Sequence, residues 1–198
     1  MGEPTVYDVL DAVRARPWMC LHEHSVRHLA TFWGTYQWTL RQYDLPISMG
    51  TPDFRHFGMW VAARRDEGLH TGGWQHFLTS EEGADGWGSF FEELDEFRRH
   101  RLHTVARAAL PTPRIWPVYT SRPGLQIVDG EMKTPETSEV VEVELRAYLP
   151  EEAFFLIAIC ADGSETERWC WTRSRAEHLA ATQLGVKPDQ WMETTAEP

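Results

Sequence analysis

The spacing of apolar residues changes near residue 110, and this change limits the folds that the chain can adopt. Before it, apolar side chains recur every three or four positions, as in helices that bury one face. After it, a proline-rich stretch leads into alternating and continuous apolar runs, which are typical of strands. We therefore predict an α+β protein with a helical N-terminal half, followed by a small antiparallel sheet with one packed helix.

The spacing predicts three helices before residue 66. The first stops at Pro17, because proline ends a helical pattern. Ser25 caps the second, whose apolar stripe continues to about residue 43. Thr51 followed by proline is the start signal of the third helix, which ends near residue 65. A short apolar element is expected after it, at 74–78.

A further helix is predicted to open at a capping box formed by Ser89 and Glu92. One of its faces is apolar and is expected to pack on a core: Trp87, Phe90, Phe91, Leu94 and Phe97. At 100° per residue, the other face carries carboxylates that are free to meet a partner: Glu92, Asp95 and Glu96. Acidic residues on an amphipathic helix usually form a solvated face, so both interpretations stay open.

The second half predicts a small sheet. Its prolines make residues 110–124 a connector or an irregular edge, and residues 124–135 form a further loop. Residues 141–148 alternate as a half-buried strand does, whereas 154–159 fit a strand covered on both faces. A turn at 161–164 then predicts a hairpin.

Ser174 and Glu177 predict a capping box for a terminal helix, which Gly185 closes. We assign residues 1–110 to a helical region and residues 111–198 to a sheet-plus-helix region. The two regions are expected to pack as one compact unit.

The chain carries a formal charge of −11, from 19 basic and 30 acidic side chains. Nucleic-acid affinity depends on cationic side chains that release counterions, so this charge argues against a nucleic acid and favours a basic protein partner. Most of the net negative charge lies in residues 111–198, which hold 8 basic and 15 acidic side chains and so contribute −7 of the −11.

The hydropathy of the chain indicates no membrane span. Mean hydropathy is −0.45, and no apolar run approaches the ~20 residues that a bilayer requires. The N-terminus lacks the basic segment of a signal peptide, so we expect a cytoplasmic protein. The odd number of cysteines, Cys20, Cys160 and Cys170, then predicts reduced thiols.

The densest polar cluster contains His22, His24 and His28. His24 and His28 are four residues apart and share a helical face, so with His22 they offer three nitrogens to a zinc ion. The interpretation that we favour is that these residues solvate and cap the start of the second helix. We therefore expect no metal and no cofactor.

No catalytic signature stands out. The serines lack a nucleophile elbow, and the glycine pairs lack the lysine of a phosphate loop. The ten tryptophans are expected in a core or at an interface. In the second half, Glu142 and Glu144 are the next candidates for contacting a partner, with Glu151 and Glu152 in reserve.

Several short motifs lie in a fixed order in the first 100 residues: Arg16-Pro17-Trp18-Met19, Gly34-Thr35-Tyr36, Phe54-x-x-Phe57-x-x-Trp60-Val61, Gly73-Trp74, Glu81-Glu82 and the run from Phe90 to Phe97. This order resembles a group of small, uncharacterised bacterial proteins, some of which look like immunity proteins encoded beside secreted toxins. Trp18 stands where the group usually has glycine, and the histidine cluster where it has a Leu-Gly turn. The resemblance covers about half the chain, implies a helical fold and an inhibitor-like role, and assigns no site residues.

We expect an acidic, cytosolic, tryptophan-rich binding protein, such as an immunity-type inhibitor of a cationic toxin or enzyme. The alternative is a small-molecule enzyme or an accessory protein of a biosynthetic pathway, with a tryptophan-lined pocket and a histidine-rich site. We favour binding over catalysis.

Overall fold

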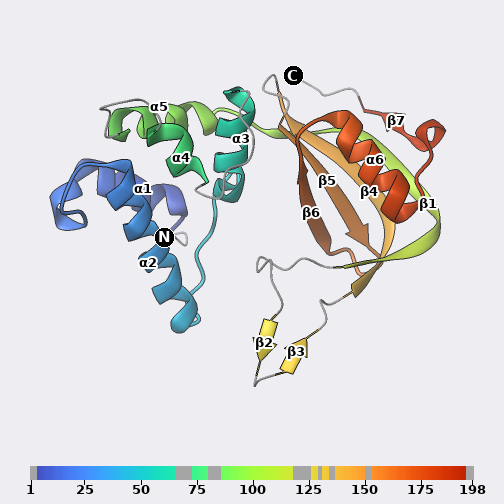
Figure 1. Ribbon diagram of the computed structural model, residues 1–198, viewed down its shortest axis with the longest axis horizontal. Coiled ribbons are helices and arrows are strands. Elements are labelled where there is room, and N and C mark those ends of the chain that lie inside the picture. Colours follow the sequence, from blue (N-terminus) through green and yellow to red (C-terminus); the bar gives the residue numbers. More distant parts are fainter. Residues whose placement is uncertain are drawn as a thin grey trace. The chain divides into compact units, whose positions relative to one another are not determined.

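The computed structural model of the chain describes residues 4–65, 73–79, 86–117, 126–128, 131–133, 137–149 and 153–194. The chain divides into two compact units, Met1–Arg101 and Leu102–Pro198. The first is helical, and the second is an antiparallel sheet carrying one helix, so the α+β prediction is confirmed (Figure 1). The division falls earlier than the predicted boundary at residue 110, because residues 102–110 already belong to the first strand.

The described part of the first unit consists of helices: α1 (Val6–Ala15), η1 (Pro17–Met19), α2 (Val26–Gln42), η2 (Phe54–His56), α3 (Phe57–Arg64), α4 (Trp74–Thr79) and α5 (Trp87–Phe97). Thr5 and Asp8 form a reciprocal capping box at the start of α1. Ser25 accepts a hydrogen bond from the backbone N–H of His28, so the predicted cap of α2 is confirmed.

Two predicted helix starts are wrong. Asp53, rather than Thr51, caps the turn before α3, and its carboxylate accepts a hydrogen bond from the backbone N–H of Arg55 at 2.8 Å. The second error concerns α5, which begins at Trp87 directly after Gly86. Gly86 has a φ of 68°, the left-handed conformation that glycine adopts without strain. The capping box expected at residues 89 and 92 does not form, because both residues lie inside the helix.

An aromatic core holds the helices of the first unit together. Phe57 of α3 lies at its centre and is fully buried. Its ring centroid lies 5.5 to 6.4 Å from those of Phe54, Trp60, Trp74, Phe90 and Phe97. Tilted and edge-on aromatic pairs contribute beyond the apolar area that they bury. The predicted apolar faces of α3 and α5 therefore meet in one core.

The second unit is built on five antiparallel strands in the order β6-β5-β4-β1-β7 (Figure 1). Its elements are β1 (Leu102–Pro117), β4 (Thr137–Tyr148), β5 (Ala153–Cys160), β6 (Glu165–Cys170), α6 (Arg173–Leu184), η3 (Pro188–Gln190) and β7 (Met192–Glu193). A separate two-stranded hairpin joins β2 (Gln126–Val128) to β3 (Glu131–Lys133). The β5–β6 hairpin and the burial of β5 on both faces are confirmed.

The connector predicted at 110–124 is wrong for its first part, because β1 continues to Pro117. The register against β4 shifts between Ala109 and Arg114, so Pro111 and Pro113 lie in a bulge of the strand rather than in a linker, whereas Pro117 pairs with Thr137. Residues 118–124 lie outside the described part of the chain. The loop predicted at 124–135 contains the β2–β3 hairpin.

The alternation predicted for β4 also shifts at one point. The register against β5 is interrupted between Val140 and Glu142, and as a result Val140 is fully buried whereas Val141 is only partly so. Val143 and Leu145 are buried in the cluster beneath α6, as their spacing predicts.

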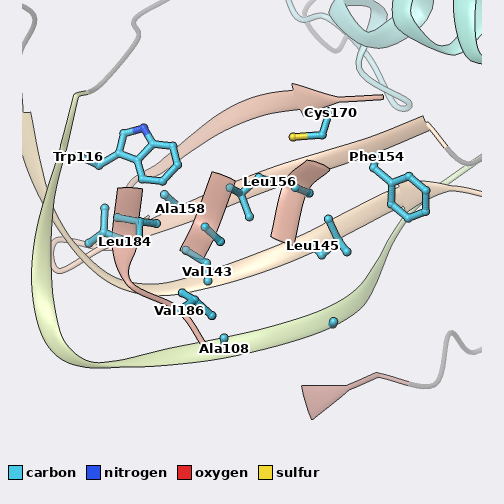
Figure 2. Packing of buried hydrophobic residues seen from close by; sticks show 14 of the residues in the cluster. Ala108, Trp116, Val143, Leu145, Phe154, Leu156, Ala158, Cys170, Leu184 and Val186 are labelled. Atoms are coloured by element: carbon cyan, nitrogen blue, oxygen red, sulfur yellow. The ribbon is translucent and has the colours of Figure 1, made fainter. Parts of the chain in front are cut away.

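Helix α6 covers one face of the sheet with small residues. Ala176, Ala180 and Leu184 belong to the same buried cluster as the inward residues of β4 and β5 (Figure 2). Thr172 caps this helix by accepting a hydrogen bond from the backbone N–H of Arg175, so the capping box predicted at Ser174 is wrong. Gly185 closes the helix in the left-handed conformation, as predicted.

Candidate functional site

The candidate carboxylates of α5 differ in whether they already pair with cationic side chains of the chain. Glu92 is exposed and makes no ion pair with any residue that the structure describes. Asp95, by contrast, accepts two hydrogen bonds from Nη1 of Arg14, at 3.0 and 2.8 Å, and lies 3.8 Å from Arg98. Because Arg14 belongs to α1, Asp95 connects two helices of the first unit and is not free to bind a partner.

Glu96 lies one helical turn after Glu92 and is partly engaged. Its carboxylate accepts a hydrogen bond of 2.5 Å from Arg99 and lies 3.6 Å from Nε2 of His100. Arg99 is an exposed side chain on the same helix end, so this pair can open at little cost. Glu96 therefore remains available for a stronger cationic partner.

Glu93 is a further functional candidate, and it is not among the residues predicted from the sequence. Its side chain is only 16% exposed, and its oxygens lie 3.5 Å from Nε of Arg64 and 3.6 Å from Nη2 of Arg65. The signal was present in the spacing, because Glu93 follows Phe90 by three positions and so borders the apolar face. Its arginine partners, however, come from another helix, and no local pattern identifies them.

These side chains line a cleft between α3 and α5, which we call the charged cleft. It encloses about 420 Å³ and is lined by Arg64, Arg65, Ser89, Glu92, Glu93 and Glu96. The arginine wall is held in place, because the Arg64 guanidinium lies 5.2 Å from the centre of the Trp60 ring and Arg65 donates a 2.6 Å hydrogen bond to the carbonyl of Phe77. The helix α5 thus presents carboxylates opposite a fixed cationic wall.

The structure overturns the choice of Glu144 as a partner-binding residue. Glu144 is 4% exposed. Its carboxylate pairs with Arg107 at 2.9 Å and Arg146 at 2.7 Å, and accepts a hydrogen bond of 3.1 Å from Thr104. Burial lowers the pKa of Arg146, but hydrogen bonds to Glu165 and Glu144 outweigh this and raise it above its usual range. A carboxylate already neutralised inside such a network has no capacity left for a partner.

Glu142 lies two residues earlier on the same face of β4 and is half-buried. It is opposite Ala109 on β1 and Ile159 on β5, and it has no ion pair within the described residues. Glu151 and Glu152 lie outside them. Of the two candidates that the structure describes on β4, Glu144 is therefore neutralised and Glu142 has no ion pair with a described residue.

The three histidines take separate roles around the start of α2. Nδ1 of His28 lies 2.8 Å from the hydroxyl of the cap residue Ser25. The His24 ring lies between two indoles, tilted against Trp18 and stacked on Trp87. The His22 ring centroid lies 6.4 Å from that of His28. Among the described residues, no three histidine, cysteine, aspartate or glutamate side chains are placed to hold a metal ion.

The three cysteines are all free thiols in the structure. Cys20 is exposed, whereas Cys160 and Cys170 are buried, and burial raises the pKa of the Cys170 thiol. Cys170 is opposite Phe154, at the far end of β5 from Cys160, so the hairpin holds these two thiols apart. The Cys170 thiol therefore lacks the lowered pKa of a nucleophile.

Within the described residues, no helix has both the length and the apolar character needed to cross a bilayer. The chain matches no protein-family model, no curated protein and no solved structure.

Proposed function

We propose that this chain is an acidic cytoplasmic protein that binds a basic protein partner through the rim of the charged cleft, in the manner of an immunity-type inhibitor. The observation that carries the proposal is Glu92, which is exposed, borders the cleft and makes no ion pair with any described residue. It lies one helical turn from Glu96, which also lines the cleft.

The arrangement favours a cation physically. Two carboxylates one turn apart on a helix repel each other by roughly 0.2–0.5 kcal/mol. A guanidinium group between Glu92 and Glu96 replaces this repulsion with charge-assisted hydrogen bonds. Arg64 and Arg65 on the opposite wall repel a cation that enters further, so the contact belongs at the rim.

The charge of the whole chain supports the same partner. A formal charge of −11 attracts a basic protein over distances beyond direct contact and raises its association rate. An inhibitor that must occlude a cationic active site benefits from fast association. The attraction weakens with salt, because the Debye length falls to about 8 Å at physiological ionic strength.

The test uses the wild-type chain and two charge-matched variants as immobilised baits in a lysate of the producing organism. Glu92→Lys with Glu96→Lys changes the cleft rim. Glu139→Lys with Asp189→Lys makes the same change in charge on exposed residues of the second unit. Each captured protein is then purified, and its activity is measured with and without the wild-type chain.

The proposal is supported by a basic protein that the wild-type and Glu139/Asp189 baits retain, that the Glu92/Glu96 bait loses, and that the wild-type chain inhibits. It is rejected if both variants lose the captured protein equally, because capture then depends only on net charge. It is also rejected if capture survives both reversals.

The competing function, a small-molecule enzyme with a tryptophan-lined pocket, is not favoured by the lining of the charged cleft. Charged side chains line the cleft, with no tryptophan among them. The histidines at 22, 24 and 28 do not assemble into a ligand set.

A further inference from the structure

The histidine cluster supports an aromatic column on the first unit. The ring centroids of Trp18 in η1 and His24 are 3.9 Å apart, and His24 stacks on Trp87 of α5 at 5.4 Å with 20° between the ring planes. Trp87 contacts Phe91 at 4.9 Å. The guanidinium of Arg14 lies 4.9 Å from the centre of the Phe91 ring and forms the inner end of the column.

The outer end of the column is Trp18, whose surface is 74% exposed. Its indole packs against the His24 ring at an angle of 39°, and the face turned away from His24 is open to solvent. The next residue, Met19, is 76% exposed. A large aromatic side chain that is already held by a ring contact loses little conformational entropy when a partner covers it, and tryptophan and methionine are enriched at protein interfaces.

The contacts within the chain indicate what the open face of Trp18 accepts. Arginine guanidinium groups lie 4.6 to 5.3 Å from aromatic ring centres at four places: Arg14 on Phe91, Arg64 on Trp60, Arg98 on Tyr7 and Arg168 on Trp116. The face of an indole attracts a cation more strongly than the other aromatic rings do. The aromatic column already carries a guanidinium at its inner end, whereas Trp18 has none among the described residues.

We propose that Trp18 anchors an arginine or lysine side chain of the basic protein partner. This inference rests on the proposed function and adds a second contact to the cleft rim. Helix α5 contributes to both contacts, since its Trp87 supports the column that ends at Trp18 of η1 and its Glu92 borders the cleft. Trp87 and Glu92 are five positions apart on α5, a rise of about 7.5 Å and a rotation of about 140° around the helix axis. A partner that contacts both Trp18 and Glu92 must therefore extend around the side of α5.

The test uses two peptide probes of equal length, N-acetyl-hexaarginine amide and its uncharged analogue N-acetyl-hexacitrulline amide. Affinity is measured by titration calorimetry at low and at physiological salt. The wild-type chain is expected to prefer the arginine peptide. Trp18→Ala should weaken that binding about two- to fivefold, the size of an exposed cation–aromatic contact.

Further variants distinguish a contact that requires an aromatic ring at position 18 from one that requires only an apolar side chain. Trp18→Phe should keep part of the affinity, whereas Trp18→Leu should lose as much as Trp18→Ala. Trp38→Ala is the matched control, because Trp38 is 62% exposed and has no ring contact among the described residues. His24→Phe should preserve binding by preserving the stack, and His24→Ala should reduce it.

Each outcome decides a different point. If Trp18→Ala binds hexaarginine like wild type while Glu92→Lys with Glu96→Lys loses it, the anchor is rejected and the proposed function stands. If Trp18→Leu retains full affinity, or if Trp18→Ala changes only self-association in sedimentation, Trp18 contacts an apolar group or a second copy and the anchor is rejected. If wild type shows no preference for hexaarginine and the Glu92/Glu96 reversal has no effect, the proposed function fails with it.

Discussion

Both carboxylate oxygens of Asp95 accept hydrogen bonds from Nη1 of Arg14, and this pair joins α5 to α1. The same guanidinium lies over the ring of Phe91, so Arg14 contacts α5 through both its charge and its flat face. Asp95 therefore has a structural role, although its position on the helix is that of a solvated or partner-binding residue.

Replacing Asp95 should cost stability without weakening partner binding. We expect Asp95→Asn to lower the free energy of unfolding by about 0.5–1 kcal/mol, a modest amount because both side chains of the pair are more than a third exposed. Urea unfolding of Asp95→Asn, Arg14→Gln and the double variant measures the coupling. Equal and additive losses would show that the two side chains do not interact, and Glu92→Gln serves as the neutral control.

Phe57 should be the most sensitive core position of the first unit. Its ring contacts aromatic residues from its own helix and from three neighbouring segments, and no small residue can fill the space that it leaves. We expect Phe57→Ala to lower the free energy of unfolding by about 3–5 kcal/mol. Trp38→Ala, on an exposed site, should change it by less than about 0.5 kcal/mol. Similar losses in both variants would contradict the position of the core.

The ion network on β4 predicts that Glu144 is needed for folding stability. Glu144→Gln leaves Arg107 and Arg146 without their shared carboxylate, and breaking a fully buried pair costs about 3–5 kcal/mol. We expect about 2 kcal/mol, because Arg107 is half exposed and can turn to water. Glu142→Gln is the matched control on the same strand. If both variants unfold at the same urea concentration, the network contributes nothing.

The hydrogen bonds of Asp53 predict that the free energy of unfolding depends on pH. Burial raises the pKa of Asp53, but hydrogen bonds from the side chain and backbone of Arg55 outweigh this and hold it below its usual value. A carboxyl with a lowered folded-state pKa contributes stability that is present above its unfolded pKa, near 4, and lost as the pH falls through the folded value. Wild type should therefore lose more stability than Asp53→Asn between pH 6 and pH 3 in urea titrations. Equal losses of stability in wild type and Asp53→Asn would show that Asp53 does not cause the pH dependence.

The candidate site shows which features of a helix its sequence pattern predicts and which it does not. The spacing of Phe90, Phe91, Leu94 and Phe97 correctly predicts the buried face of α5, because helical geometry relates residues three and four apart. The same arithmetic places Glu92 in solvent, which the structure bears out. The same spacing also predicts that Asp95 lies in solvent. It does not predict the ion pair of Asp95 with Arg14, because Arg14 belongs to α1 and the spacing within α5 carries no information about that helix.

The predicted helix ends also show that sequence patterns are reliable only where the interaction is local. Ser25 and Gly185 are correctly predicted, since each acts on its own turn of helix. The caps expected at Thr51 and Ser174 are displaced by two residues, and the cap expected at Ser89 by three, because several residues nearby are able to cap and packing selects among them.

What the sequence determined by itself is therefore local: the order of helices and strands, their apolar faces and the excess of negative charge. Only the tertiary structure decided that Glu144 is buried between two arginines, that Glu93 faces Arg64 across a cleft, and that His24 supports an exposed Trp18. Each of these contacts depends on which elements become neighbours. That choice is made by the packing of whole faces, so the same glutamate pattern yields a free carboxylate on one element and a neutralised one on another.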